Sequence, residues 1–213
     1  LGRDDGLIHP KAPITRAEVT TIFFRLLTQT VRDANLTTTN AFSDVNADLW
    51  CNTAVSTMTK LGIVRGRSET TFDPNAYITR AEFAAIAARF DKAVVNQMAG
   101  FSDINGHWAA MEISKAAANG WVNGYSDGTF KPDQNITRAE AMALINRMLN
   151  RAPETLNDLL PGMNRWADNM DTTEWYYLDV QEATNSHIHE HRKSGYEAWT
   201  APEKDPDWKA YEN

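Results

Sequence analysis

A five-residue sequence, Ile-Thr-Arg-Ala-Glu, occurs three times in this chain, and each copy opens an apolar run at helical spacing. The copies occupy residues 14–18, 78–82 and 136–140. A Thr followed by a Glu at the third position after it is a capping box, in which each side chain binds the backbone N–H of the other residue. The repeat therefore predicts three helices, and their N-caps are Thr15, Thr79 and Thr137.

The arginine of each copy is not explained by capping. Arg16, Arg80 and Arg138 occupy the first helical position, where the helix dipole disfavours a cation by roughly 0.3–1 kcal/mol. An arginine beside free backbone N–H groups at a helix start can hold a carboxylate or a phosphate. We therefore expect these side chains to contact an anionic ligand; solvated surface or an internal ion pair is the alternative. Removing one should weaken binding and leave the melting temperature nearly unchanged.

A glycine-containing block precedes each copy at a fixed distance. It covers residues 2–8, 66–72 and 124–130 and is followed by Pro10, Pro74 or Pro132. Glycine, Asp-Gly and proline favour turns, so the block predicts a loop that leads into the capped helix. The middle copy has Thr70 where the others have Gly6 and Gly128. If that glycine requires a positive φ, the middle loop must differ.

A third block, Phe-Ser-Asp followed by a tryptophan, precedes the loop in the second and third copies. Trp50 and Trp108 are each followed after twelve residues by a glycine, Gly62 or Gly120. The apolar spacing between them predicts one amphipathic helix with a left-handed glycine at its C-terminus. The aspartates Asp44, Asp103 and Asp168 recur with the repeat, which favours a capping or turn role over acid–base chemistry.

The repeats divide the chain into five segments: 1–28 is the first repeat with loop and capped helix only, 42–92 the second repeat, 101–150 the third, 166–187 a helix completing the first repeat, and 188–213 a C-terminal tail. The first repeat lacks a tryptophan helix, whereas the C-terminal segment has one that starts near Trp175. We therefore expect this helix to pack beside the helix that begins after Thr15. Leu1 starts in the middle of the pattern, so the natural polypeptide is expected to extend upstream.

Composition limits the function classes. The net charge of −7 argues against bulk attraction to nucleic acid or an anionic membrane, so any anionic ligand must be held by local arginines. No apolar run approaches the ~20 residues of a membrane span. The single cysteine, Cys51, excludes a disulfide framework within the chain.

Catalytic and metal chemistry are not predicted. His187, His189 and His191 alternate along one stretch and would share a face of a strand, but no fourth metal ligand is evident. Cys51 has no histidine nearby in the sequence. We therefore expect no enzyme active site, no cofactor and no metal site.

Three motifs in fixed order give the chain a resemblance to a known family. In the copy from Phe101 to Leu149 they read Phe-Ser-Asp-x-x-x-x-Trp, Gly-Tyr-x-Asp-Gly-Thr-Phe-x-Pro and Ile-Thr-Arg-Ala-Glu. This combination resembles the S-layer homology domain, and the segment from Trp166 to His187 looks like the C-terminal extension of such proteins in gut Firmicutes. The resemblance implies an all-α fold, a pseudo-three-fold helical spindle of three repeats, each a helix, glycine loop and capped helix, with an irregular C-terminal tail.

The same resemblance implies a function and a place. Domains of this family hold proteins on the bacterial cell wall, outside the cell, by non-covalent binding of pyruvylated secondary cell-wall polysaccharide, an anionic partner. By resemblance the ligand-binding residues are Arg16, Arg80, Arg138, Trp50, Trp108, Gly124, Tyr125 and Asp127. For the two tryptophans, core packing is favoured over ligand contact. Arg67 and Arg3 replace the loop tyrosine of the third copy, so the three grooves are not expected to be equal. The alternative function is a structural self-assembly or protein-interaction module without a sugar ligand.

Overall fold

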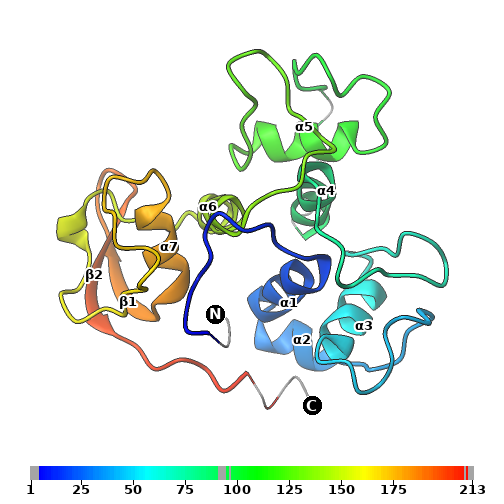
Figure 1. Ribbon diagram of the computed structural model, residues 1–213, viewed down its shortest axis with the longest axis horizontal. Helices are drawn as coiled ribbons and strands as arrows, with labels where there is room; N and C mark the ends of the chain where they lie inside the picture. Colours follow the sequence, from blue (N-terminus) through cyan, green and yellow to red (C-terminus); the bar gives the residue numbers. More distant parts are fainter. Residues whose placement is uncertain (1–4, 91–94, 96, 209, 211–213) are drawn as a thin grey trace. The chain divides into compact units, whose positions relative to one another are not determined.

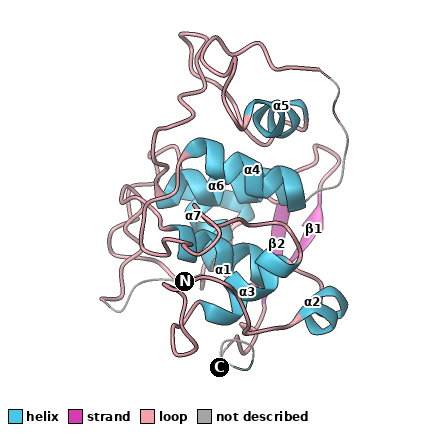
Figure 2. Cartoon of the chain, turned by 90° about the vertical axis from the view of Figure 1, so that its right-hand side faces the viewer, coloured by secondary structure: helices cyan, strands magenta, loops and turns pink. Residues whose placement is uncertain are grey.

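The computed structural model describes residues 5–90, 95, 97–208 and 210; Gly2 and Arg3 of the first loop block lie outside this range. Its elements, in chain order, are α1 (Arg16–Leu26), α2 (Gln29–Asn35), α3 (Asn52–Lys60), α4 (Arg80–Phe90), α5 (Ala110–Ala118), α6 (Arg138–Leu149), the short 3-10 helix η1 (Leu156–Asp158), α7 (Tyr177–Thr184), β1 (His187–His191) and β2 (Glu197–Pro202) (Figure 1). The described part of the chain is therefore mostly helical, with one small sheet (Figure 2).

The chain divides into two compact units. The α1–α5 unit comprises Ile14–Ala118, Val122–Ile136 and the described residues of Asp207–Asn213. The α6–α7 unit comprises the described residues of Leu1–Pro13, with Asn119–Trp121 and Thr137–Pro206.

All three predicted capping boxes are present. The Thr15 hydroxyl accepts a hydrogen bond from the Glu18 N–H at 3.2 Å, and the Glu18 carboxylate accepts one from the Thr15 N–H at 2.8 Å. The pairs Thr79–Glu82 and Thr137–Glu140 repeat both bonds. Each capped helix therefore begins at the arginine of the repeated sequence, because the cap fixes the start locally.

The tryptophan helices form where predicted, and each begins two residues after its tryptophan, at Asn52, Ala110 or Tyr177. Gly62 and Gly120 follow the first two of these helices with a φ of 72° each, as a left-handed C-cap requires. In the α1–α5 unit, α3 packs on α1 and α5 packs on α4.

The last tryptophan helix packs on the third capped helix. In the α6–α7 unit, α7 packs on α6, where Val180 is buried among Ala139, Met142 and Tyr176. Each tryptophan helix thus packs on a capped helix that precedes it in the chain: α3 on α1, α5 on α4, and α7 on α6. The apolar stripe of α6 thus covers that of α7, as α1 covers that of α3. Packing of the last tryptophan helix beside the Thr15 helix stays a prediction.

The repeated aspartates anchor the loops. Asp44 accepts hydrogen bonds from the backbone N–H groups of Phe72 and Asp73, at 2.9 and 2.6 Å. Asp103 binds Phe130 and Lys131 in the same way, and Asp168 binds Ile8 and His9. The second residue of each pair, Asp73, Lys131 or His9, has a positive φ between 52° and 63°. The predicted turn role of these aspartates is confirmed, and the carboxylate holds a strained residue in each loop.

The middle loop differs from the others, as predicted. Gly6 and Gly128 have φ values of 75° and 80°, whereas Thr70 is not among the described residues with a positive φ. A threonine is β-branched and avoids the left-handed region, so the chain takes another course at this position.

Three buried isoleucines join the repeats within the α1–α5 unit. The N–H of Ile14 donates to the carbonyl of Ile136, that of Ile136 donates to Ile78, and that of Ile78 donates back to Ile14, at 3.2, 3.1 and 3.0 Å. Their exposed fractions are 2% or less. The residues just before the three caps thus form a closed ring of hydrogen bonds.

The C-terminal segment contains a hairpin that was not predicted. β1 and β2 pair antiparallel, with an irregularity in register between Ile188 and His189, and Gly195 supplies a φ of 89° in the connecting turn. The expected all-α class and irregular tail were therefore wrong for residues 187–202. Further along, Trp208 lies against the guanidinium groups of Arg25 and Arg32, at 5.4 and 5.2 Å from the ring centre.

Candidate anion-binding groove

The guanidinium of Arg16 fastens a loop of the next repeat. Its Nε donates to the carbonyl of Phe72 at 3.0 Å and its Nη2 to the carbonyl of Arg65 at 2.8 Å. Its Nη1 lies 2.7 Å from Oε1 of Glu82, the same carboxylate that caps α4. Arg16 is 6% exposed, so this charge is buried and paired rather than presented freely to solvent.

The equivalent arginines act in the same way. Nε of Arg80 donates to the carbonyl of Phe130 at 2.8 Å, and Nε of Arg138 donates to the carbonyl of Ile8 at 2.7 Å. Both residues are less than 9% exposed. A buried guanidinium with loop carbonyl partners contributes to stability. Removing one of these side chains would leave loop carbonyls without their donors, so on the structure we expect the melting temperature to fall.

The backbone N–H groups at the helix starts are also occupied. The N–H groups of Arg16 and Ala17 donate to the carbonyls of Ala76 and Pro74, and that of Glu18 donates to the Thr15 cap. The other two capped helices repeat this pattern with loop carbonyls. The predicted receptor made of free helix-start N–H groups was therefore wrong, because the neighbouring loop already fills it.

A groove of about 520 Å³ opens beside Arg16 within the α1–α5 unit, and we call it the Arg16 groove. Its lining residues come from α1, the loop after α3, the capped helix α4 and the third repeat: Arg16, Thr20, Val64, Arg65, Gly66, Arg67, Phe72, Thr79, Glu82, Ala85, Ile86, Arg89, Trp108 and Asp133. Four arginines thus face two carboxylates, in a chain whose net charge is −7. The groove is a local cationic site, as an anionic ligand requires.

The rim of the groove carries the accessible cations. Arg65 is exposed, and the Arg67 side chain is 44% exposed, with long ion-pair distances of 3.4 Å to Asp73 and 3.6 Å to Glu82. Arg89 is less exposed and lies 3.2 Å from Glu112. Exposed, loosely paired guanidinium groups can exchange their partners for a ligand carboxylate at little cost.

The repeated tryptophans are on the surface. Trp50, Trp108 and Trp175 are 50%, 60% and 59% exposed, so the favoured expectation of core packing was wrong. Each precedes the first residue of its helix and so lies outside the buried helical stripe. Trp108 borders the Arg16 groove, where its indole offers an apolar wall beside the arginines.

The loop of the third repeat brings together three of the residues implied by the resemblance. The Tyr125 ring lies 5.0 Å from the Arg80 guanidinium and 3.9 Å from Nζ of Lys131. Asp127 is bound to the N–H and hydroxyl of Thr129, as in a turn. A Cβ on Gly124 would clash with the Phe101 ring, so only glycine lets this ring pack against the loop.

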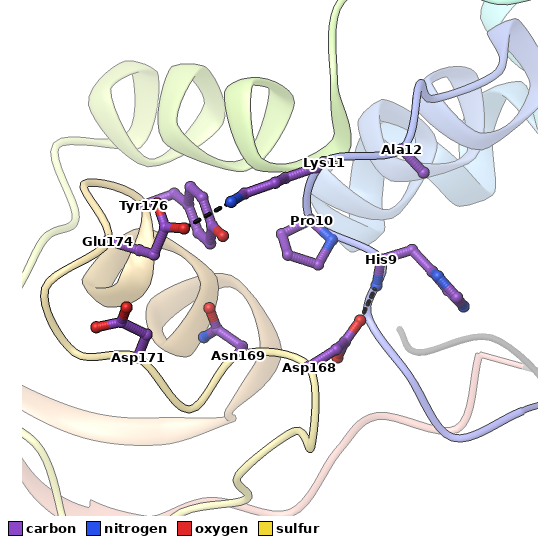
Figure 3. Close-up of a pocket in the computed structure, with 9 residues that line it drawn as sticks. All are labelled: His9, Pro10, Lys11, Ala12, Asp168, Asn169, Asp171, Glu174 and Tyr176. Carbon is purple, nitrogen blue, oxygen red and sulfur yellow. Dashed lines mark hydrogen bonds and ion pairs between the residues drawn. The ribbon is translucent and has the colours of Figure 1, made fainter.

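A smaller pocket of about 370 Å³ lies in the α6–α7 unit, and we call it the Lys11 pocket (Figure 3). Nζ of Lys11 reaches Oε1 of Glu174 at 2.6 Å, beside the ring of Tyr176. Asp168 and Asp171 also line it. The carboxylates of this pocket outnumber its one lysine, and its histidine, His9, is already 2.6 Å from Asp5.

Arg65 and Arg89 line the groove but were not predicted from the sequence. Arg89 lies nine residues after Arg80, and Arg25 and Arg147 have the same offset from Arg16 and Arg138, so the repeat itself carried the signal. Glu82, Ala85, Ile86 and Arg89 also follow the i, i+3, i+4, i+7 spacing of one helix face, which is the face that lines the groove.

Cys51 is buried, and burial raises the pKa of its thiol to about 11, so the thiol is protonated at neutral pH.

Comparison with known proteins finds a family profile that matches part of this chain. Residues 41–84 and 100–142 match the profile of the S-layer homology domain. Two segments of this chain are therefore similar to S-layer homology repeats. They include the loop of the Arg16 groove, its tryptophan and the first turn of α4.

Relatives extend the likeness over more of the chain. This chain is 34% identical over 202 residues to the cellulosome-anchoring protein of Acetivibrio thermocellus. The aligned region covers 92% of this chain and 44% of that protein. The chain is 33% identical over 198 residues to cell surface glycoprotein 1 of the same organism, covering 87% of this chain and 8% of the glycoprotein. The S-layer protein of Bacillus licheniformis is 29% identical over 152 residues, which are 68% of this chain and 16% of that protein.

The chain thus carries two segments that match the S-layer homology domain, and its relatives are named as anchoring and surface-layer proteins. The chain spans less than half the length of these relatives. Among the residues that the structure describes, no helix combines the length and apolarity that crossing a bilayer demands.

Proposed function

We propose that this chain is a non-covalent anchor that binds an anionic cell-wall polysaccharide through the Arg16 groove. The observation that carries the proposal is the charge of this groove, where four arginines face two carboxylates in a chain of net charge −7. A cationic groove on an acidic protein selects an anion locally and avoids non-specific attraction to nucleic acid. The names of the relatives, cellulosome-anchoring protein and S-layer protein, agree with an anchoring role.

For the ligand we propose a sugar that carries a pyruvate ketal. Such a ketal fixes one carboxylate to a rigid ring, so its recognition needs a planar cation beside a flat apolar surface. Arg67, on the exposed rim, can pair with the carboxylate while the half-exposed indole of Trp108 covers the sugar. Arg16 positions these groups indirectly, because its guanidinium is hydrogen-bonded to the loop that carries Arg65 and Arg67.

We assign the remaining resemblance residues by analogy with this groove. Arg80 and Tyr125 would serve a second groove, with Gly124 and Asp127 shaping its loop. Arg138 and the exposed Trp50 would serve further sites of the pseudo-three-fold spindle. The grooves are unequal, because Arg67 stands where the third repeat has Tyr125.

We further propose that residues 166–187 complete the first repeat, which would give three repeats in all. The bonds from Asp168 to the N–H groups of Ile8 and His9 support this, since Asp44 and Asp103 bind the loops of the other repeats identically. The likeness of this segment to extensions found in gut Firmicutes stays a prediction.

A second candidate function is self-assembly into a surface layer without a sugar ligand, which the relatives named S-layer proteins favour. A protein lattice does not require exposed arginines around a groove of this kind. The two functions therefore differ in what the groove binds, and one experiment separates them.

The experiment is co-sedimentation of the chain with purified, peptide-free cell-wall polysaccharide from an S-layer-bearing Gram-positive bacterium. We expect binding that is lost after mild acid removal of the pyruvate ketals and weakened in an Arg67→Ala variant. Lys11→Ala is the matched control, since it removes an exposed cation from the Lys11 pocket. Equal binding before and after removal of pyruvate would refute the ligand, and concentration-dependent sheets without polysaccharide binding would favour self-assembly.

A further inference from the structure

The C-terminal hairpin gathers histidines and a glutamate on one face. His187 and His189 of β1 turn toward Glu197 of β2, and one side-chain donor atom of each lies within 4.8 Å of the others. His191 is also on this face, with its Nε2 3.9 Å from Oε1 of Glu197. The three histidines have no further metal ligand near them in the sequence, but the hairpin supplies one because β2 folds back on β1.

Glu197 is buried without an adequate partner. It is 0% exposed, and neither carboxylate oxygen has a hydrogen-bond partner among the described residues. Oε1 of Glu182, which is 4% exposed, is in the same condition. Its distance to Nε2 of His187 is 3.5 Å. A buried carboxylate without hydrogen bonds costs several kcal/mol unless a cation compensates it. The site therefore calls for positive charge.

The neighbouring arginine supplies only part of that charge. Nη2 of Arg151 lies 3.1 Å from Oε1 of Glu182, but its Nε is 3.9 Å from Oε2 of Glu197 and has no hydrogen-bond partner. One guanidinium thus approaches the edge of a site that holds two carboxylates. The histidine side of Glu197 remains for another cation.

The hydrogen bonding of His187 is that of a metal ligand. Its Nδ1 is 2.8 Å from the carbonyl of Asn185. A carbonyl only accepts, so Nδ1 bears a proton, and Nε2 is the ring nitrogen that faces Glu182, Glu197 and, at 3.5 Å, Nη2 of Arg151. Metal-bound histidines typically donate their second N–H to such a carbonyl, which fixes the tautomer. The ring is also stacked on Trp199 at 4.0 Å, so its orientation is held by packing.

We propose that His187, His189 and Glu197 bind a divalent transition-metal ion of the zinc class, with His191 or water as the fourth ligand. Ligands at about 2.0–2.2 Å from a tetrahedral ion lie roughly 3.3 Å from one another. Nε2 of His189 and Oε1 of Glu197 are 3.2 Å apart, and Nε2 of His187 and Oε2 of Glu197 are 3.8 Å apart. Imidazole-rich donors select zinc, nickel or copper over calcium and magnesium. The ion would link β1 to β2 and neutralise the charge of Glu197. Its role would be structural rather than catalytic.

The test uses the whole chain after treatment with EDTA and removal of the chelator. We expect isothermal titration with Zn²⁺ to give about one site per chain. At free Zn²⁺ near 100 times its Kd, the melting temperature should rise by roughly 5–10 °C, while Ca²⁺ or Mg²⁺ produces no rise. Substitution with Co²⁺ should give the visible absorption of a four-coordinate nitrogen and oxygen site.

Variants separate this site from adventitious binding. His189→Ala should lower Zn²⁺ affinity at least tenfold, and His191→Ala should lower it less because that side chain is 54% exposed. His9→Asn is the matched control; this histidine lies outside the cluster, and asparagine tolerates its positive φ. Far-UV circular dichroism checks that each variant folds. The proposal is overturned if the folded wild-type chain binds no Zn²⁺, or if His189→Ala binds it as tightly as His9→Asn does.

Discussion

The Arg16 groove and the Lys11 pocket have related walls and opposite charge. A loop fixed by a repeated aspartate borders each of them: Asp44 fixes the loop of the groove and Asp168 that of the pocket. Arginines predominate in the groove, whereas carboxylates surround Lys11. Residues that recur with the repeat build the backbone frame, and exposed residues that vary between repeats decide which ion the frame can accept.

The largest expected effect is a loss of stability when a buried residue of the repeated backbone framework is removed. Arg16→Ala should lower the free energy of unfolding by about 3–5 kcal/mol, because it removes three hydrogen bonds and leaves Glu82 without its closest partner. Urea denaturation measures this, with Arg67→Ala as the control that should change stability by less than about 0.5 kcal/mol. Equal stability of the two variants would mean that the buried arginine is not part of the frame.

The next effect concerns the exposed cations of the groove. Arg67→Ala should weaken binding to pyruvylated wall polysaccharide by roughly 10- to 100-fold, the value of one charge-assisted hydrogen bond. Lys11→Ala in the other pocket should leave the affinity unchanged. Surface plasmon resonance on immobilised polysaccharide compares the two, and equal losses would remove the distinction between groove and pocket.

Trp108 and Trp175 give a comparison at matched exposure, 60% and 59%. Trp108→Ala should weaken polysaccharide binding by about 5- to 10-fold through loss of the apolar wall, whereas Trp175→Ala should not. Both variants should melt within a few degrees of the wild type, because the rings are largely outside the core. Surface plasmon resonance measures both affinities. A loss of affinity in Trp175→Ala but not in Trp108→Ala would place the polysaccharide site away from the Arg16 groove.

The smallest effect is a dependence of stability on acid. Burial raises the pKa of Asp44, but the N–H groups of Phe72 and Asp73 outweigh it and hold the pKa below its usual value of 3.8. The stabilisation from a depressed pKa is complete above the unfolded-state pKa and is lost as pH falls through the folded-state pKa. Urea midpoints between about pH 6 and about pH 2.5 should therefore fall less in Asp44→Asn than in the wild type. Parallel curves would exclude Asp44 as an acid-sensitive anchor of the groove loop.

Local features of the fold were readable from the sequence. The three Thr–Glu capping boxes and the glycines after the tryptophan helices depend on residues close together in the chain, so spacing alone predicted them. The loop-anchoring aspartates were placed correctly in turns for the same reason. The partners of those aspartates lie as far away as 160 residues, and only the structure identifies them.

The groove and the hairpin could be predicted from the sequence only in small part. The helix dipole made Arg16 look misplaced, but the carbonyls that justify its position belong to a loop some fifty residues later in the chain. Trp108 was expected in the core because the predicted helix was extended back to it, whereas α5 begins two residues later, at Ala110. The hairpin was missed because the partner of His189 is Glu197, which becomes visible only once the chain turns back.

The ring of Ile14, Ile78 and Ile136 has a consequence for the order in which the molecule forms. Its members are separated by 64 and 58 residues, and each hydrogen bond joins two different repeats. Closing such long loops is slow, and a chain that has only two of the isoleucines available can make one of the three bonds. A growing polypeptide therefore cannot complete this centre until Ile136 has been synthesised. Folding of the α1–α5 unit thus waits for the third repeat, and the first two repeats remain without their shared centre until then.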